Sequence, residues 1–160
     1  MRVVVTGGAG FIGSSLVDRL ILDGHGVTVL DNFSTGAHAF LDASRSSPRL
    51  EIVEMDLLEE AARIGEVIEG ADAVVHLAAN ADVRFGWDAP HRDLEQNVLV
   101  THHLLESMRV TGVRRILFSS TGSVYGETKE IPTPEDAHFP IQTSLYAASK
   151  LAAEGFIQAY

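Results

Sequence analysis

The stretch that decides the fold is Arg2-Val3-Val4-Val5-Thr6-Gly7-Gly8-Ala9-Gly10-Phe11-Ile12-Gly13. Its first five residues are a β-branched apolar run, which predicts a fully buried strand. The residues that follow, 14–22, place Leu16, Leu20 and Ile21 on one stripe, as an amphipathic helix does. A strand, a glycine-rich loop and a helix in succession are the context that a dinucleotide-binding fingerprint requires.

The glycines of this loop fit two registers, Gly8-x-Gly10-x-x-Gly13 and Gly7-x-x-Gly10-x-x-Gly13. In such a loop one glycine makes the tight turn, one lets backbone N–H groups approach a pyrophosphate, and one lets helix and strand pack closely. The N-terminus of the helix adds free N–H donors and the positive end of its dipole. An ordinary glycine-rich turn is the alternative, and the flanking strand and helix favour cofactor binding.

Composition limits the remaining possibilities. The chain has 160 residues, of which 46% are hydrophobic, and its formal net charge is −10. This charge argues against a nucleic-acid or anionic membrane surface as partner. With no cysteine there is neither a disulfide framework nor a thiolate zinc site, and we expect no metal. The N-terminus shows no secretory signal pattern and no apolar run reaches membrane-spanning length, so we expect a cytoplasmic protein.

Apolar runs alternate with helical patterns along the rest of the chain. We expect further strands at 27–30, 50–54, 73–77 and 115–118, helices at 58–68, 93–110 and 144–160, a short helical piece at 37–44, and irregular loops at 81–91 and 129–143. Leu94, Val98, Leu104, Leu105 and Met108 should line one side of the long helix. This alternation predicts an α/β fold, a doubly wound parallel sheet of Rossmann type with helices on both faces.

Several residues at strand ends are candidates for cofactor contacts. Asp31 lies 18 residues after Gly13, the spacing of an acid that binds adenosine ribose hydroxyls, although it would also serve as a strand-end cap. A carboxylate there repels a 2′-phosphate, so NAD is expected rather than NADP. Asp56 and Leu57 are placed to flank an adenine, or Asp56 caps a helix. Leu77 is followed by two small residues, Ala78 and Ala79. Small side chains there would let a nicotinamide ribose lie close to the backbone, and they are equally consistent with tight packing.

Tyr146 and Lys150 are four residues apart on the last helix and so share a face. An ammonium beside a phenol favours the phenolate, which can take a proton from an alcohol. An exposed helical pair is the plain alternative. Thr121 follows a strand end, where its hydroxyl can hydrogen-bond the same alcohol, and Ser119 and Ser120 have the same chemistry. His102 and His103 do not share a helix face, so we expect surface or interface residues rather than metal ligands.

Taken together, these stretches resemble the NAD-dependent epimerase/dehydratase family of extended short-chain dehydrogenases/reductases. The matching segments are 6–13, 31–36, 56–57, 76–79, 97, 119–126 and 146–150. The resemblance implies that Thr121, Tyr146 and Lys150 carry the chemistry. It implies cofactor contacts by Gly7, Gly10, Phe11, Ile12, Gly13, Asp31, Asn32, Ser34, Thr35, Gly36, Asp56, Leu57, Leu77, Ala78, Ala79, Asn97 and Ser119, together with Tyr146 and Lys150.

Within this family the motifs are most like those of nucleotide-sugar 4-epimerases of the UDP-glucose/UDP-galactose type. The resemblance implies transient oxidation at sugar C4, with Tyr146 as base and tightly bound NAD. Related dehydratases carry an acidic pair where Gly122 and Ser123 stand, and decarboxylases carry a glutamate at the position of Ser123. Another dehydratase, decarboxylase or reductase, or a non-catalytic NAD-binding scaffold, is the alternative.

The resemblance also implies parts beyond these residues. The chain ends ten residues after Lys150, so we expect residues 1–160 to form an incomplete NAD-binding domain that lacks further strands and a substrate lobe. Alone it should be inactive and associate through an open sheet edge. The complete protein is expected to be a homodimer, through the helices at 93–110 and 144–160.

Overall fold

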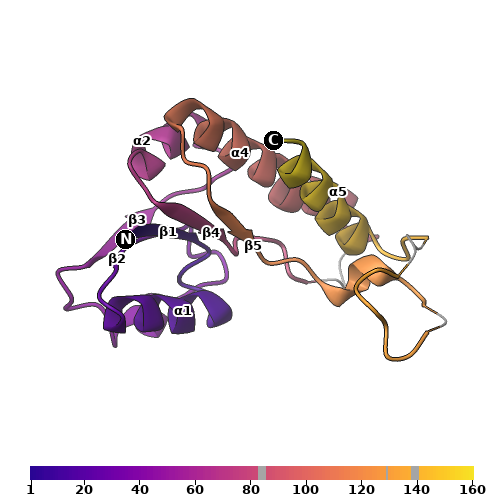
Figure 1. Ribbon diagram of the computed structural model, residues 1–160, viewed down its shortest axis with the longest axis horizontal. Helices are drawn as coiled ribbons and strands as arrows, with labels where there is room; N and C mark the ends of the chain where they lie inside the picture. Colours follow the sequence, from indigo (N-terminus) through magenta and orange to yellow (C-terminus); the bar gives the residue numbers. More distant parts are fainter. Residues whose placement is uncertain (83–85, 129, 138–140) are drawn as a thin grey trace. The chain divides into compact units, whose positions relative to one another are not determined.

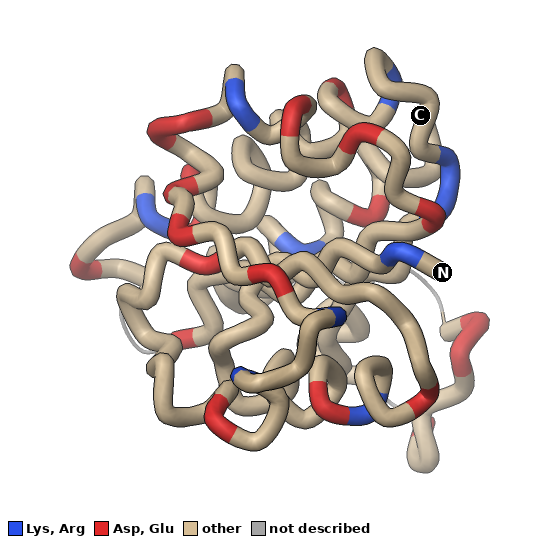
Figure 2. Tube along the Cα trace, turned by 90° about the vertical axis from the view of Figure 1, so that its left-hand side faces the viewer, with Lys and Arg blue, Asp and Glu red and all other residues tan. Residues whose placement is uncertain are grey.

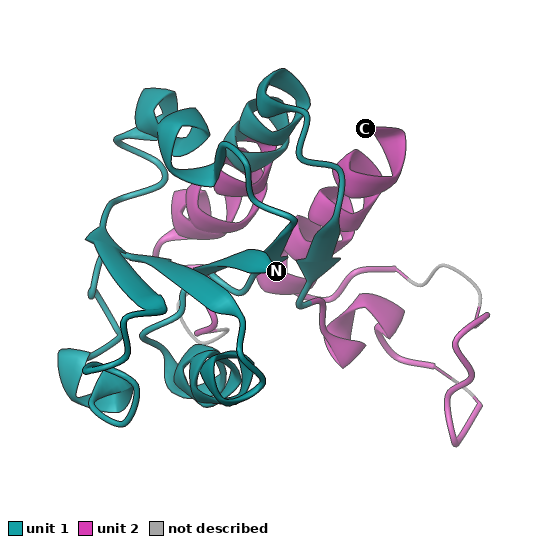
Figure 3. Cartoon of the chain, turned by 60° about the vertical axis from the view of Figure 1, so that its left-hand side comes forward, with its two compact units in different colours: residues 1–78, 103–119 teal, residues 79–102, 120–160 magenta. Residues whose placement is uncertain are grey.

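The computed structural model describes residues 1–82, 86–128, 130–137 and 141–160. Parts of the two expected loops, 81–91 and 129–143, therefore lie outside the described residues. The chain divides into two compact units (Figure 3). The first unit holds residues 1–78 and 103–119, and the second holds residues 79–102 and 120–160.

The first unit contains a five-stranded parallel sheet (Figure 1). Its strands are β1 (Arg2–Thr6), β2 (Gly26–Asp31), β3 (Leu50–Glu54), β4 (Ala73–His76) and β5 (Ile116–Phe118). Their order is β3-β2-β1-β4-β5, and Val5 lies opposite Val29 on one side and Val75 on the other. The direction of winding reverses at β1, beside β4, where ligands bind in open sheets of this kind. The predicted strands and the parallel sheet are confirmed.

Side chains alternate between the two faces of this sheet. Val3, Val5 and Val29 pack with Val17 of helix α1 (Phe11–Leu22). The predicted stripe of Leu16, Leu20 and Ile21 packs against the same cluster, partly buried. In Figure 1, α2 (Ile64–Ile68) lies across the sheet from α1, and its two end residues are fully buried. Helices therefore cover both faces of the sheet.

The helix expected at 58–68 is much shorter than predicted. Residues 61–63 form the 3₁₀ turn η2 (Ala61–Arg63), and only Ile64–Ile68 is α-helical. The reason is the capped turn before it, in which Asp56 Oδ1 accepts N–H bonds from Leu58 at 2.9 Å and Glu59 at 3.2 Å. A glycine at position 65 further lowers the helical preference. The short piece expected at 37–44 is the 3₁₀ turn η1 (His38–Leu41).

The long helix expected at 93–110 is not regular. It consists of α3 (Pro90–Asp93), a π-helical turn η4 (Leu94–Leu99) and α4 (Val100–Thr111). The wider turn shifts the side-chain register, so Leu94 is 54% exposed rather than on the buried stripe. Leu104, Leu105 and Met108 are buried as predicted.

The second unit also holds the 3₁₀ turn η5 (Gly122–Tyr125) and helix α5 (Leu145–Ala159). Ser144 caps α5, and its Oγ accepts the N–H of Ala147 at 3.1 Å. This cap fixes the start of the helix one turn before Lys150. Within the unit, α5 packs against η4 and η5.

Acidic positions outnumber basic ones and are interspersed with them in both units (Figure 2). Binding of an anionic ligand therefore depends on local donors rather than on the net field of the chain. In the part of the chain that the structure describes, no helix is long and apolar enough to cross a membrane.

Candidate functional site

The glycine loop after β1 requires glycine at two backbone positions. Gly7 has a φ of +69°, and a Cβ there would lie 2.7 Å from the backbone nitrogen of Ala78. A Cβ on Gly13 would lie 2.2 Å from the carbonyl oxygen of Gly7. A Cβ on Gly8 would instead meet the side chain of Val29 at 2.8 Å. Of the two possible registers, Gly7-x-x-Gly10-x-x-Gly13 is thus the one that the backbone imposes.

The loop delivers the N-terminus of α1 to the surface. Gly10 is the N-cap and, having no side chain, makes no capping hydrogen bond. Phe11 and Ile12 in the first turn are 88% and 64% exposed. The first N–H groups of a helix lack intrahelical acceptors, so this end offers donors to an anion. The geometry fits the pyrophosphate of a dinucleotide.

Asp31 ends β2 with its carboxylate turned toward that loop. One oxygen, Oδ2, accepts the N–H of Ala9 at 2.9 Å, and Oδ1 accepts the N–H of Phe33 at 2.8 Å. The side chain is 9% exposed. The strand-end cap considered above is therefore present. It leaves each oxygen a further lone pair, so it is compatible with binding of ribose hydroxyls.

The loop after Asp31 is folded against the glycine loop. Ala37 donates its N–H to the carbonyl of Ala9 at 3.1 Å, and a Cβ on Gly36 would lie 2.9 Å from that same oxygen. Ser34 and Thr35 are exposed, and Ser34 N–H donates to Asn32 Oδ1 at 3.0 Å. Asp31 and Gly36 thus lie beside the glycine loop, whereas Asn32 faces Asp56.

A hollow of about 510 Å³ lies at the carboxyl ends of β2 and β3. Its lining is formed by Asn32, Glu54, Met55, Asp56 and Glu60. Asn32 Nδ2 donates to Asp56 Oδ2 at 2.7 Å. Partial burial acts to raise the pKa of Asp56, but the hydrogen bonds from Asn32 and the N–H groups of Leu58 and Glu59 outweigh it and lower the pKa. Asp56 is therefore a preformed acceptor beside the hollow.

Leu57 is 7% exposed, so its side chain belongs to the core. Leu57 is also not among the residues that line the hollow.

The end of β4 is joined to β1 by buried side chains. Thr6 Oγ1 lies 2.7 Å from His76 Nδ1, and Ala78 N–H donates to Thr6 Oγ1 at 3.2 Å. Both Thr6 and His76 are almost fully buried. This bond fixes the backbone of Leu77 and Ala78 where the glycine loop approaches. The structural part played by His76 had no signal in the sequence beyond its place in a strand.

In the second unit, Asn97 is the centre of a buried polar network. Its Nδ2 donates to Ser149 Oγ at 2.9 Å and to Asp93 Oδ1 at 3.4 Å. Its Oδ1 accepts the N–H of Asn80 at 2.8 Å, and Asn80 Nδ2 donates to Asp93 Oδ1 at 2.8 Å. Asn80, Asp93 and Ser149 were not predicted as site residues, although the four-residue spacing of Asp93 and Asn97 places them on one helix face.

Tyr146 and Lys150 lie on successive turns of α5. Tyr146 is half-buried, whereas Lys150 is only 3% exposed. Burial lowers the pKa of Lys150 to about 8, because the charged ammonium loses its hydration. The exposed helical pair considered above is therefore ruled out for Lys150.

Thr121 is half-buried and caps η5. Its Oγ1 accepts the N–H of Ser123 at 3.2 Å and donates to Ser123 Oγ at 3.2 Å. Ser120 donates its hydroxyl hydrogen to the carboxylate of Glu154 on α5. Ser119 belongs to the first unit, where its N–H donates to the carbonyl of His76 at 3.3 Å. Of the three hydroxyl residues, Thr121 is thus the one held by its own turn.

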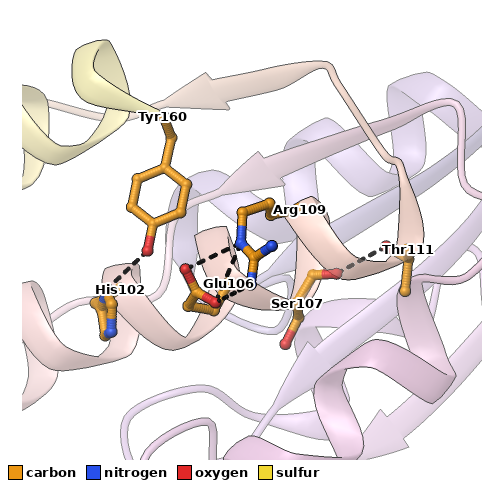
Figure 4. Close-up of polar contacts among 6 residues, drawn as sticks. All are labelled: His102, Glu106, Ser107, Arg109, Thr111 and Tyr160. Carbon is orange, nitrogen blue, oxygen red and sulfur yellow. Dashed lines mark hydrogen bonds and ion pairs between the residues drawn. The ribbon is translucent and has the colours of Figure 1, made fainter.

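The two adjacent histidines have separate surroundings. His102 Nδ1 lies 3.3 Å from the hydroxyl of Tyr160 (Figure 4), and its ring also contacts Phe156. His103 Nδ1 lies 3.4 Å from the carbonyl of Leu57. Among the described residues, no group of three or more His, Asp or Glu side chains is arranged to hold a metal ion.

The predicted residues therefore fall into two sets, one in each unit. Those of the first unit are Gly7, Gly10, Phe11, Ile12, Gly13, Asp31, Asn32, Ser34, Thr35, Gly36, Asp56, Leu57, Leu77, Ala78 and Ser119. Those of the second are Ala79, Asn97, Thr121, Tyr146 and Lys150. The first set follows the carboxyl ends of the five strands, and all of the second set except Ala79 lies at or near η4, η5 and α5.

This fold, with the glycine loop after its first strand, is that of a dinucleotide-binding domain. Residues 3–160 match the NAD dependent epimerase/dehydratase family, and the chain belongs to that family. The family's cofactor is NAD, which fits the uncapped helix end and the acidic strand end described above.

Individual relatives agree with this assignment. A UDP-glucose 4-epimerase of Mycolicibacterium smegmatis is 43% identical over 100% of this chain and 51% of its own length. The Thermus thermophilus UDP-glucose 4-epimerase, solved in complex with NAD, is 37% identical with a TM-score of 0.89, over 100% of this chain and 50% of its own. UDP-glucuronic acid decarboxylase 1 of Arabidopsis thaliana is 39% identical over 84% of this chain and 29% of its own length. The chain thus spans about half the length of the epimerases it matches.

Proposed function

We propose that the whole protein is an NAD-dependent 4-epimerase of UDP-sugars, of the UDP-glucose/UDP-galactose type. The observation that carries the proposal is the pair formed by Tyr146 and the buried Lys150 on one face of α5. Similarity to enzymes named UDP-glucose 4-epimerase supports the same choice.

The first unit supplies the adenosine and pyrophosphate contacts in this proposal. The glycine loop and the first turn of α1 bind the phosphates, Asp31 the ribose hydroxyls, and Asn32, Asp56 and the Leu57 backbone surround the adenine. Ser34, Thr35 and Gly36 close the ribose side, and Leu77, Ala78, Ala79, Asn97 and Ser119 support the nicotinamide half. NAD, when bound, supplies the hydride acceptor and donor at its nicotinamide ring.

The chain's own residues manage the proton in this proposal. Tyr146 Oη takes the proton of the sugar 4-hydroxyl and returns it when the alcohol re-forms. Thr121 hydrogen-bonds the same oxygen. The ammonium of Lys150 favours the phenolate form of Tyr146. Because the sugar keeps its atoms, no water or carbon dioxide leaves, and the same base serves both directions.

The turn after β5 favours epimerisation over the related reactions. Elimination of water requires an acid beside the sugar, and positions 122 and 123 are Gly122 and Ser123, which carry no carboxylate. One decarboxylase is 39% identical to this chain. The resemblance implies, however, that decarboxylases carry a glutamate at position 123, where this chain has Ser123. Retention of Tyr146 and Lys150 speaks against a scaffold without catalysis.

The test is to give the purified full-length protein UDP-glucose, UDP-galactose and other UDP-sugars and to identify the products by NMR. Interconversion of C4 epimers without added NAD supports the proposal. A 4-keto-6-deoxy product or release of carbon dioxide would place the protein in another branch. NAD binding with no turnover of any UDP-sugar would favour the alternative of a non-catalytic NAD-binding scaffold. Tyr146→Phe is the control for a contaminating epimerase.

We further propose that the complete protein is a homodimer. Phe156 on α5 and Tyr160, the residue after the end of that helix, are 40% and 48% exposed, and Val110 on α4 is 73% exposed. Apolar residues on helices beyond what the core needs are typical of an isologous interface. Light scattering of the full-length protein should report a dimer, and monomer alone at micromolar concentration would contradict this.

A further inference from the structure

A side-chain hydrogen bond ties the turn that carries Thr121 to helix α5. Ser120, the residue before Thr121, donates its hydroxyl hydrogen to Oε1 of Glu154. Ser120 is exposed and Glu154 half-buried. Glu154 stands one helical turn after Lys150 and two after Tyr146, so these three side chains share a face of α5.

A second hydrogen bond ties the other end of the same turn. Gln142, just before the start of α5, donates from its side-chain amide nitrogen Nε2 to the carbonyl of Val124 at 2.9 Å. Residues 120–124 therefore run past residues 142–154 in the opposite direction. In the first segment, Thr121 lies between the residues that make these two hydrogen bonds. In the second segment, Tyr146 and Lys150 do.

We infer that Glu154 is a positioning residue, which holds Thr121 in register with Tyr146 through the hydrogen bond from Ser120. This inference rests on the proposed function, in which Thr121 and Tyr146 must reach one sugar oxygen. A misplacement of about 1 Å between groups that share a reacting atom can cost about 100-fold in rate. The carboxylate touches no reacting atom itself.

The bond also fixes the direction of the Ser120 hydroxyl. A hydroxyl has one hydrogen to donate, and that of Ser120 is given to Glu154. A hydrogen bond to an ionised carboxylate is stronger than one between neutral groups. Ser120 thus serves as an anchor between the turn and α5.

The experiment uses the full-length protein and UDP-galactose, with Glu154→Ala, Glu154→Gln, Ser120→Ala and the Ser120→Ala/Glu154→Ala double variant. Gln158→Ala, an exposed position on the same helix, is the matched control. Glu154→Ala should lower kcat about 10- to 100-fold with KM within about threefold of the parent. Glu154→Gln keeps an acceptor oxygen and should restore most of kcat. The double variant should be no slower than either single one, because both remove the same bond.

An active parent whose Glu154→Ala variant keeps its kcat would overturn this inference and leave the proposed function standing. Additive losses in the double variant would also overturn it, since the two residues would then act separately. A failure of Glu154→Gln to recover kcat would assign the effect to charge and not to the hydrogen bond, which contradicts the inference. A parent that epimerises no UDP-sugar would overturn the proposed function, and with it the catalytic meaning of this bond.

Discussion

Asn97 donates a hydrogen bond from Nδ2 to Oγ of Ser149, 2.9 Å away and one residue before Lys150. Ser149 in turn donates to the carbonyl of Tyr146 at 2.8 Å. The π-helical turn η4 is thereby joined to the part of α5 that carries both proposed catalytic side chains. The orientation of the Asn97 amide is fixed from both ends, because its oxygen accepts from the backbone of Asn80.

Replacing Asn97 should therefore destabilise the protein. Asn97→Ala leaves the N–H of Asn80 and Oδ1 of Asp93 with fewer partners in a buried place, and each such loss costs about 1–3 kcal/mol. The free energy of unfolding, measured with urea, should fall by at least that amount. Gln96→Ala, its half-buried neighbour, is the control. Equal stability of the two variants would show that the network contributes nothing to the fold.

Burial of the charged Lys150 side chain should lower the free energy of unfolding. Its pKa is lowered from 10.5 to about 8 in the folded protein, so between these values the unfolded chain binds more protons. Stability without NAD should therefore rise as the pH increases from about 8 to about 10.5. Lys150→Met should remove this rise and stabilise the protein at pH 7 by up to about 3 kcal/mol while abolishing turnover.

The measurement is urea unfolding of both proteins between pH 7 and 10.5, a window that the pKa values define. Arg45→Met, an exposed cation in the first unit, is the control for loss of one charge. If the free energy of unfolding of the parent changed with pH in the same way as that of Lys150→Met, burial of Lys150 would not be the cause of the pH dependence.

Asp31 should select NAD over NADP, because its carboxylate repels a 2′-phosphate. Calorimetry on the full-length protein, stripped of cofactor, should give tighter binding of NAD. Asp31→Asn should reduce the difference in affinity between NAD and NADP. It should also destabilise the loop, because the side-chain amide has only one acceptor atom and cannot accept from both Ala9 and Phe33 as the two carboxylate oxygens do. Equal or tighter binding of NADP by the parent would rule out the assignment of Asp31.

Tyr146→Phe should remove the proton acceptor and leave NAD bound. Loss of a general base lowers turnover by about 100- to 10,000-fold. Thr121→Val should be milder, since it deletes one hydrogen bond to the sugar oxygen. Tyr160→Phe is the matched control, because it removes a hydroxyl of the same helix region that contacts His102 (Figure 4). Activity of Tyr146→Phe within a few-fold of the parent would mean that another group is the base.

The elements that could be predicted are those fixed by local pattern. β1 and β3 were placed to the residue, since both are short segments in which β-branched apolar residues predominate at the centre. The spacing from Gly13 located Asp31, and the four-residue interval placed Lys150 beside Tyr146. A cap at Asp56 was among the possibilities, but pattern could not give the shortness of the helix that follows it, nor the π-helical break at η4.

The supporting residues of the site were also beyond reach of the sequence. The partners of Asn97 come from three separate segments, and only folding shows that Asn80 and Ser149 meet it. The interaction of Ser120 with Glu154 joins residues 34 positions apart for the same reason. Long-range polar contacts of this kind carry no periodicity, so they must be seen in three dimensions.

The π-helical turn η4 has one more residue than an α-helical path would use between the same ends. A deletion of a single residue within Leu94–Leu99, such as Gln96, would restore the ordinary hydrogen-bond ladder and give a regular helix. The segments on either side would keep their places, because the wider turn is what accommodates the extra residue. The interval between Asp93 and Asn97 would shrink from four residues to three, so the number of residues in this turn sets the geometry of the hydrogen bond that joins them, now 3.4 Å long.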